Sequence, residues 1–388
     1  MKTLVYGGTF NPPHLGHFKA ASAAAEQLSP ERLLIIPDNI APHKEMADYT
    51  PEASQRYEMC ALAFQGIKDA EVSDMEIRRS GRSYSSDTVA LLREKYPEDE
   101  LFLLVGTDML LSFEQWHDFE YILKNVTLAV ISREEDDKEK IQKNISYLSR
   151  EYGARAVVLD AEPFVISSTE ICALLPERKG REYLSDSVYS YIIKNRLYGA
   201  KPDFDWLREK GWSYLKKSRI PHVMGCEQKA VELAELYGAD IDDARTAAIL
   251  HDSTKKLSPE EQLKLCDTYG IINDKSEMNT PKLLHAKTGA ELARREFGAN
   301  GEVCSAIRWH TTGKPGMSLL EMIIYLADYV EPTRDFPGVE EIRKAVSESL
   351  EAGMAAGLKN TIDEVKGYGT VPYKDTTEAY EYYRKLSE

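Results

Sequence analysis

The chain has 388 residues, which is too long for one ordinary hydrophobic core and predicts two or three domains. Hydrophobic residues make up 43% and charged residues 29%, a composition that excludes a wholly disordered chain, a collagen and a membrane bundle. The formal net charge is −15, shared between a net −9 up to Gly199 (23 basic, 32 acidic) and −6 after it (26 basic, 32 acidic). This acidity argues against binding of a long polyanion such as a nucleic acid. A small anionic ligand is still possible, because it needs only a few local cations and backbone N–H groups.

The five cysteines are odd in number, widely spaced and lack a C-x-x-C pair, so a disulfide framework is not expected. The apolar start runs into Gly7-Gly8 too soon for a signal peptide, and no apolar run approaches the roughly 20 residues that span a bilayer. We therefore expect a cytoplasmic protein without a membrane partner. The sequence leaves open whether it forms a homo-oligomer.

The first half alternates short apolar runs with helix-like periodicity, which predicts a parallel sheet covered by helices, in a Rossmann-like doubly wound α/β fold. The predicted strands are 2–6, 33–37, 101–105, 126–131 and 155–159, and the predicted helices are 18–28, 53–66 and 85–95. In such a fold, ligands bind at the carboxyl ends of the strands.

After Tyr198-Gly199-Ala200-Lys201-Pro202 the strand patterns disappear and long amphipathic patterns dominate, so this half is predicted to be an all-α bundle. We predict a first domain at 1–198, a linker at 199–204 and a second domain at 205–388. The amphipathic patterns are 206–219, 222–237, 242–251, 259–269, 286–297, 318–330, 339–359 and 376–386.

The first candidate site is the segment GGTFNPPHLGH, from Gly7 to His17, which follows a predicted strand and opens a predicted helix. Glycines let the backbone approach a phosphate, and a helix N-terminus supplies unpaired N–H donors. His14 and His17, on either side of Gly16, can point into one pocket, where two imidazole donors can stabilise charge on a phosphate. The segment predicts a nucleotide-binding loop whose first residues are Gly7, Gly8, Thr9 and Phe10.

This segment resembles the signature of the HxGH nucleotidylyltransferases, and its full form resembles nicotinate-nucleotide adenylyltransferase. Later segments are similar to motifs of the same family, in the same order: Pro42-His43-Lys44, Ser83–Thr88, Gly106–Leu110 with Trp116-His117, and Ile166–Ile171. The related pantetheine-phosphate adenylyltransferases share the first and last motifs, but not Pro-His-Lys or Trp-His. The resemblance covers about residues 1–198.

The resemblance implies that nicotinate mononucleotide attacks the α-phosphorus of ATP, giving nicotinate adenine dinucleotide and pyrophosphate, with Mg²⁺ held largely by the triphosphate. It also implies a role for each matching residue. His14, His17, Lys44 and His43 would contact phosphate groups, Ser168 and Thr169 would donate to the β- and γ-phosphates, Asp108 would contact a ribose hydroxyl, Trp116 would stack on the pyridine ring, and Ser85 would lie near the pyridine carboxylate.

One position departs from the family pattern. The motif ending at Ile171 is usually followed by arginine, and this chain has Cys172 there. A thiol cannot replace a guanidinium fork, so a cation expected near the phosphates is missing. Arg133, Lys179 or Arg181 would have to compensate, or the affinity for ATP would be lower.

The second candidate site is a set of four histidines and two aspartates on or beside predicted helices. These ligand types suit iron, manganese or zinc, and helices can aim them into a bundle core. Six ligands exceed the need of one zinc and suit two metals bridged by a carboxylate, while the lack of cysteine pairs argues against a structural zinc site. The residues are His222, His251, Asp252, His285, His310 and Asp328.

The order H…HD…H…H…D is similar to that of HD-domain phosphohydrolases. The strings Leu284–Ala286, Ile307–Gly313, Tyr325–Pro332 and Arg334–Gly338 resemble the bacterial HD-type symmetrical diadenosine-tetraphosphate hydrolase, over about residues 205–388. The resemblance implies that a metal-bound hydroxide cleaves diadenosine tetraphosphate to two ADP, with iron or manganese as the metals. Asp252 would bridge the metals, and Lys255, Thr311 and Arg334 would contact the substrate.

We therefore expect a bifunctional enzyme that acts on small nucleotides. Three alternatives concern the second domain: hydrolysis of another nucleotide such as a dNTP or a guanosine alarmone, a non-catalytic nucleotide sensor, and an RNA-binding helical module. The complete ligand set argues against a sensor, and the net charge of −6 argues against an RNA-binding module.

Overall fold

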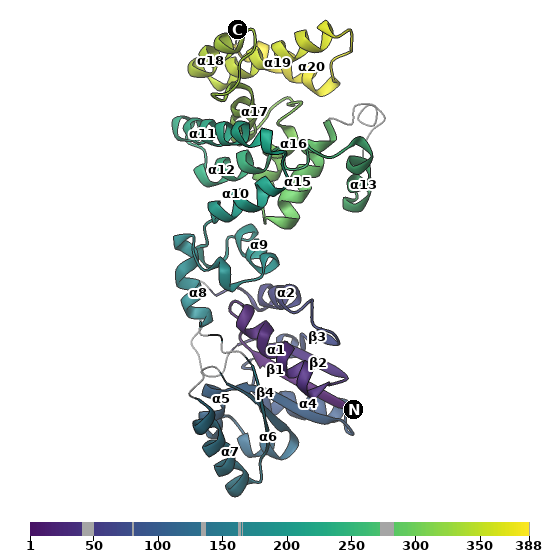
Figure 1. Cartoon of the computed structure of the whole chain (residues 1–388), viewed down its shortest axis with the longest axis vertical. Coiled ribbons are helices and arrows are strands. Elements are labelled where there is room, and N and C mark those ends of the chain that lie inside the picture. Colours follow the sequence, from purple (N-terminus) through teal and green to yellow (C-terminus); the bar gives the residue numbers. More distant parts are fainter. Residues whose placement is uncertain are drawn as a thin grey trace. The chain divides into compact units, whose positions relative to one another are not determined.

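The computed structural model describes residues 1–40, 50–79, 81–132, 137–161, 164, 166–271 and 283–387. The chain divides into two compact units, one of Met1–Ile192 with Arg196–Ala200 and the other of Ile193–Asn195 with Lys201–Glu388. The first unit combines strands and helices, whereas the described part of the second is helical (Figure 1). No described helix is both long enough and apolar enough to span a membrane.

The first unit contains a six-stranded sheet in which every strand is parallel to its neighbours, in the order β3-β2-β1-β4-β5-β6. This confirms the predicted Rossmann-like sheet. The strands are β1 (Lys2–Gly8), β2 (Arg32–Pro37), β3 (Ala70–Val72), β4 (Glu100–Gly106), β5 (Thr127–Ile131) and β6 (Arg155–Leu159). The prediction omits β3, because a strand of three residues is too short to show a periodic pattern.

Helices cover the sheet because its central strands are apolar on both faces. Val5, Leu34 and Leu103 on neighbouring strands pack with Leu92 and Ile122, on α4 and α6, in one buried core. The helices are α1 (Leu15–Leu28), α2 (Ala53–Ala63), α3 (Met75–Arg78), α4 (Ser85–Lys95), α5 (Thr107–Leu111), α6 (Phe119–Asn125), α7 (Lys138–Tyr152), α8 (Ser168–Leu174) and α9 (Asp186–Lys194).

A buried arginine fixes the loops that follow β1 and β2. The Arg56 side chain is 1% exposed, and its Nη1 donates to Asp38 Oδ1 and to the carbonyl of Thr9, both at 2.8 Å. Its Nη2 donates to the carbonyls of Asp38 and Asn39, at 2.8 and 2.9 Å. One guanidinium therefore ties together the carboxyl ends of two adjacent strands, where the sequence predicts ligand binding.

The second unit is built around α17, whose side chains are mostly buried and which contacts α11, α12, α16 and α19. Its described helices are α10 (Phe204–Ser213), α11 (Ile220–Tyr237), α12 (Ile241–Leu250), α13 (Pro259–Tyr269), α15 (Leu284–Glu296), α16 (Gly301–Trp309), α17 (Leu319–Val330), α18 (Val339–Glu348), α19 (Leu350–Gly367) and α20 (Lys374–Ser387). The all-α prediction is confirmed, although the predicted ranges omit α16.

The predicted continuous helix over 339–359 is wrong, because the structure divides it at Ser349. This residue has extended backbone angles (φ −163°, ψ 159°), and its side chain accepts a hydrogen bond from the Ala352 N–H at 3.0 Å. Serine competes well for the backbone at a helix start, so it ends α18 and caps α19. The amphipathic pattern continues across the break and hides it from a periodicity argument.

The buried arginine gives a stability prediction. Arg56→Ala should lower the free energy of unfolding of the first unit by about 3–5 kcal/mol, because it leaves a buried carboxylate and three carbonyls without their donor. Hydrogen exchange of peptides from β1 and β2, followed by mass spectrometry across a urea series, measures this locally. Arg78→Ala is the matched control, since Arg78 pairs with Asp74 on the surface and should cost about 0–1 kcal/mol. Equal losses in the two variants would contradict the assigned role of Arg56.

Candidate functional sites

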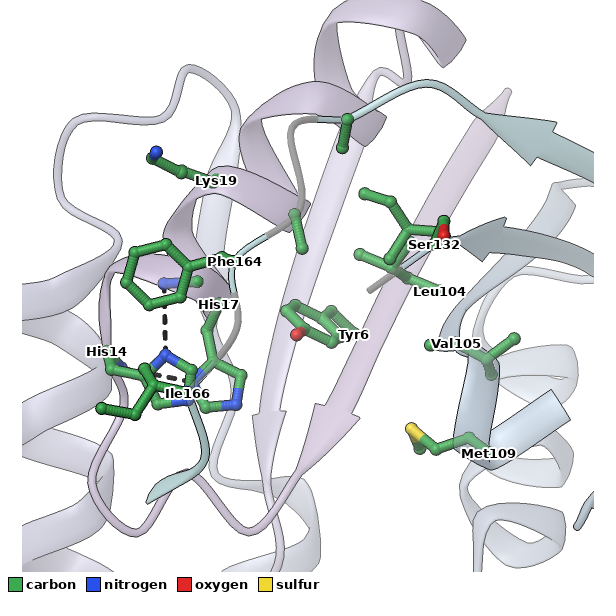
Figure 2. A pocket seen from close by; sticks show the side chains of 15 residues that line it. Tyr6, His14, His17, Lys19, Leu104, Val105, Met109, Ser132, Phe164 and Ile166 are labelled. Atoms are coloured by element: carbon green, nitrogen blue, oxygen red, sulfur yellow. Dashed lines mark hydrogen bonds between the residues drawn. The ribbon is translucent and has the colours of Figure 1, made fainter. Parts of the chain in front are cut away.

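The first site lies at the carboxyl end of β1. From β1 the strand order continues through β2 and β3 on one side and through β4, β5 and β6 on the other, so it reverses at this strand. This is the topological switch point at which doubly wound sheets bind ligands. The pocket there is lined by residues from the carboxyl ends of β1, β4 and β5 and from the start of α1. In Figure 2, His14, His17, Phe164 and Ile166 gather on one side of the pocket, and Leu104, Val105 and Met109 lie on the other, with Tyr6 between them.

Two backbone hydrogen bonds fix the histidine rings. His14 is the N-cap of α1, and its Nδ1 accepts from the Gly16 N–H at 3.1 Å, while Nδ1 of His17 accepts from the His14 N–H at 3.1 Å. A nitrogen that accepts an N–H cannot itself carry a proton, so each ring is neutral and protonated at Nε2. The ring centroids are 3.8 Å apart, which places two Nε2–H donors of fixed tautomer next to each other.

The loop before α1 and the first turn of this helix are closely packed around the two histidines. A Cβ at Gly16 would come within 3.0 Å of the His14 ring and would collide with Phe164, so the close packing of the pair requires glycine. Phe10 is buried, has a left-handed backbone (φ 46°) and packs edge-on against His17, with ring centroids 5.1 Å apart. The hydroxyl of Thr9 donates to Asp38 Oδ2 at 2.9 Å, so it supports the loop as part of the Arg56 network.

Gly7 and Gly8 lie at the end of β1, paired in register with Ile36 and Pro37 of β2. The described residues of the pocket in Figure 2 do not include Ser85, Asp108 or Trp116. Asp108 is exposed on α5, two residues after the end of β4. Trp116 is half-buried and stacks on Phe113, with centroids 4.7 Å apart.

The family resemblance relates two segments to the pyridine ring: the start of α4, with Ser85, and the segment Trp116-His117. The two segments are side by side in the structure. Ser86, next to Ser85 at the start of α4, forms a 3.2 Å hydrogen bond with Nδ1 of His117. The His117 ring also lies against Tyr84, with centroids 4.5 Å apart. Ser85 and Trp116 therefore belong to one local arrangement, and their contact with a substrate remains a prediction.

The start of α8 is attached to the same loop. Ser168 Oγ donates to the carbonyl of Pro12 at 3.0 Å, and the exposed Thr169 follows it in the first turn. Ser167 and Glu170 cap the helix reciprocally. Ser168 thus lies next to the His14 loop, and the phosphate contacts of Ser168 and Thr169 remain predictions. His43 and Lys44 lie outside the described residues.

Cys172 is buried under this loop. Its Sγ donates to the carbonyl of Asn11 at 3.6 Å, and burial raises the pKa of the thiol to about 11. The thiol therefore packs as a neutral group and supplies no charge near a phosphate. Of the cations named as replacements, Lys179 pairs with Glu177 and Arg181 pairs with Asp186, and Arg133 lies outside the described part of the chain.

The second site lies in the helical unit, where the structure brings together all six predicted metal ligands. His222 comes from α11, His251 and Asp252 follow α12, His285 comes from α15, His310 follows α16 and Asp328 comes from α17. Nε2 of His222 lies 3.0 Å from Asp328 Oδ1, and Nε2 of His285 lies 3.3 Å from Asp252 Oδ1. Five of the six residues are buried, and the Asp328 side chain is 14% exposed.

Local carbonyls set the tautomers of two histidines in this cluster. His251 and His310 are the C-caps of α12 and α16, and their Nδ1 atoms lie 2.7 Å from the carbonyls of Ala248 and Ile307. A carbonyl only accepts, so Nδ1 carries the proton and Nε2 presents a lone pair. Nε2 of His251 is buried and makes no well-aligned hydrogen bond with any described residue.

The charge state of the cluster also suits a cation. Desolvation lowers the pKa of both His285 and His310 and favours neutral imidazoles. Burial acts to raise the pKa of Asp252 and Asp328, but hydrogen bonds with neighbouring histidines and the charges of nearby cations outweigh it and hold both well below their ordinary value. Neutral imidazoles beside ionised carboxylates are the state that a divalent metal requires, so the residues fit such an ion.

Three cations surround the two carboxylates. Arg219 Nε lies 2.6 Å from Asp252 Oδ2, Lys255 Nζ lies 3.0 Å from Asp252 Oδ1, and Arg334 Nη2 lies 2.5 Å from Asp328 Oδ1. Lys255 and Arg334 thus lie at the cluster, and their contact with a substrate remains a prediction. Thr311 directly follows His310, and its Oγ1 is buried and makes no hydrogen bond within the described ranges.

Sequence reasoning missed two further members of the site. Glu331 is fully buried, and its Oε1 accepts from Nδ1 of His222 at 3.0 Å and from Thr333 Oγ1 at 2.6 Å, an arrangement that orients a metal-binding imidazole. Gly225 leaves the space for this carboxylate, which a Cβ there would occupy. Arg219 was also missed. The signal was present in the string Tyr325–Pro332, which contains Glu331, but a contact with His222 is not readable from sequence.

Comparisons with known proteins agree with this division. The Cytidylyltransferase-like family matches residues 5–173, and the HD domain family matches residues 219–333. A symmetrical bis(5′-nucleosyl)-tetraphosphatase of Bacillus subtilis (strain 168) is 43% identical over 149 residues, covering 38% of this chain and 80% of that protein. A protein of Carboxydothermus hydrogenoformans named as a probable nicotinate-nucleotide adenylyltransferase is 34% identical over 195 residues, covering 50% of this chain and 96% of that protein.

The chain belongs to the Cytidylyltransferase-like family through its first unit and to the HD domain family through its second. A crystal structure of a predicted HD superfamily hydrolase involved in NAD metabolism, from Clostridium acetobutylicum, is 37% identical to it. That match covers 48% of this chain and 100% of the other, with a TM-score of 0.46. The adenylyltransferase-like unit contains the His14 loop, and the HD unit contains the histidine and aspartate cluster, for which an HD domain implies divalent metal binding.

The hydrogen bond between Glu331 and His222 can be tested in the HD unit. Glu331→Gln should weaken divalent metal binding by about 10–100-fold, because an amide holds the imidazole less firmly and does not increase its basicity. Competition with a fluorescent chelator measures the affinity. Glu321→Gln is the control, since Glu321 is equally buried on α17 but pairs with Lys314 and Ser305. Unchanged affinity in Glu331→Gln, or an equal loss in the control, would contradict the role of Glu331.

Proposed function

We propose that the chain is a bifunctional enzyme. Its first unit transfers the adenylyl group of ATP to nicotinate mononucleotide, giving nicotinate adenine dinucleotide and pyrophosphate. Its second unit hydrolyses diadenosine tetraphosphate symmetrically to two ADP. The similarity of each unit to a different enzyme family supports this assignment, and the side-chain geometry supports each half separately.

The observation that carries the transferase assignment is the pair of fixed Nε2–H donors on His14 and His17. In adenylyl transfer, a phosphate oxygen of the mononucleotide attacks the α-phosphorus while the bond to pyrophosphate breaks, so negative charge develops on oxygens and no protein nucleophile is needed. Two donors held in place before the reaction stabilise that charge without reorganisation. Mg²⁺ bound to the triphosphate would neutralise part of the remaining charge.

The other predicted contacts complete this half of the proposal. Ser168 and Thr169, beside the same loop, would meet the β- and γ-phosphates, and Asp108, after β4, would meet a ribose hydroxyl. Trp116 and Ser85 would hold the pyridine ring, and Lys44 with His43 would add positive charge. Because Cys172 is a neutral thiol where the family usually has arginine, the histidine donors and the start of α8 would contribute more to phosphate binding than in a relative with that arginine.

His17→Ala should lower kcat for adenylyl transfer by about 10²–10³-fold, the usual cost of removing one preorganised donor. The assay measures pyrophosphate released from ATP and nicotinate mononucleotide. Lys143→Ala is the control, because Lys143 is exposed on α7 and belongs to none of the predicted substrate contacts. Hydrogen exchange of peptides from β1 and β2 in the His17→Ala variant, compared with the unmodified protein, shows whether the first unit is folded. Unchanged turnover in His17→Ala would reject the first-site assignment.

The hydrolase assignment rests on the cluster of four histidines and two aspartates with three cations around it. A pair of divalent metals held by these residues would supply an activated water and would neutralise a polyphosphate. We propose iron as the metal and manganese as the alternative. Asp252 is central among the ligands, and Lys255, Arg334 and Thr311 would contact phosphate oxygens.

Asp252→Ala should lose bound metal and hydrolysis of diadenosine tetraphosphate while retaining adenylyl transfer, because the carboxylate within reach of three histidines is gone. Elemental analysis and chromatography of the products check the two effects. Asp267→Ala, an exposed aspartate on α13, is the matched control. ATP plus AMP as products, or cleavage of a dNTP or a guanosine alarmone in place of diadenosine tetraphosphate, would reject the proposed substrate and reaction.

A further inference from the structure

A cysteine that none of the family motifs includes enters the metal cluster. Cys226 follows His222 by four residues on α11, a spacing that puts both side chains on one face of the helix. Its Sγ lies 3.4 Å from Nε2 of His222, the atom that also faces Asp328. The thiol is 1% exposed, so it is directed into the cluster and away from solvent.

The ligand atoms around this thiol have the spacing of one metal site. One ligand atom each from His222, Cys226, His251 and Asp328 lies within 4.8 Å of the others. With metal–nitrogen and metal–sulfur bonds of about 2.05 and 2.3 Å, a tetrahedral ion separates its nitrogen and sulfur ligands by about 3.6 Å, close to the observed 3.4 Å.

His251 gives a second, independent sign of a ligand at this point. Its ring is 1% exposed, its Nδ1 is bonded to the Ala248 carbonyl, and its Nε2 has no well-aligned hydrogen bond within the described part of the chain. Nε2 lies 4.0 Å from Asp328 Oδ1. A buried lone pair without a donor costs free energy unless a cation or a proton donor meets it.

We infer that Cys226 is a thiolate ligand of the ion held by His222, His251 and Asp328. The inference rests on the metal-dependent function proposed above and adds one ligand to it. On binding, a metal–sulfur bond replaces the S–H bond and the proton is released to solvent; no electrons are transferred. The second group of candidate ligands also includes His251, whose Nε2 can bind only one ion, and its other members, Asp252 and His310, offer only oxygen and nitrogen. The two positions therefore differ in chemistry.

The sulfur ligand has a consequence for metal choice. Thiolates favour iron, cobalt and zinc over the harder manganese and magnesium ions, which prefer oxygen ligands. A cluster with one sulfur-containing position and one nitrogen and oxygen position would take up iron or zinc preferentially at the first.

Substitution with cobalt tests the inference by spectroscopy and does not depend on turnover. The full-length protein is loaded with Co²⁺ in the presence of a phosphine reductant, and bound cobalt is quantified. A cobalt–thiolate bond gives an intense near-ultraviolet charge-transfer absorption, which nitrogen and oxygen ligands do not produce. We expect this band in the unmodified protein and its loss in Cys226→Ala and Cys226→Ser, with cobalt still bound through the remaining ligands.

Cys266→Ala is the matched control, because Cys266 is equally buried in the same unit, on α13, and should leave the band unchanged. Bound cobalt without the band, or a band that persists in both Cys226 variants, overturns thiolate ligation and leaves the metal-dependent function intact. Failure of the unmodified protein to bind cobalt overturns both.

Discussion

The hydrogen bond between a histidine Nδ1 atom and the local backbone determines what each site can do. His14 is at the start of a helix, where N–H groups lack partners, so its Nδ1 accepts and its Nε2 carries the proton. His251 and His310 are at helix ends, where carbonyls lack partners, so Nδ1 donates and Nε2 presents a lone pair. The same side chain therefore becomes a hydrogen-bond donor at one helix terminus and a metal-binding base at the other.

This constraint explains why the surroundings of the histidines are so restricted. The ring of His14 fits only because Gly16 has no side chain, and that of His222 is held by Glu331 in the space that Gly225 leaves. In each site, a glycine thus leaves the space that the functional ring or its hydrogen-bond partner occupies. The buried guanidinium of Arg56 has a related role in the first unit, since it fixes the loop that leads to His14.

The sequence allowed the fold and the main histidines to be predicted, because both depend on local patterns. Buried strands are short apolar runs, and the string from Gly7 to His17 is a contiguous motif. The strand β3 was missed because three residues are too few to show a hydrophobic period, and the break at Ser349 was missed because it does not interrupt one. Glu331 was missed because its contact with His222 depends on the packing of α11 against the end of α17, which the sequence does not reveal. Cys226, the proposed additional ligand, was missed because no family motif includes it, although its spacing from His222 is that of one helix face.

The charges around the HD cluster have a consequence for the order in which ligands assemble. Asp252, Asp328 and Glu331 are opposed by Arg219, Lys255 and Arg334, so the fixed charges of the protein nearly cancel. Each divalent ion that enters adds net positive charge to a balanced, largely desolvated region, which then attracts anions. By thermodynamic linkage, a polyphosphate bound there must in turn tighten the hold on the metal. Metal and nucleotide are thus expected to bind cooperatively, with no change of shape required.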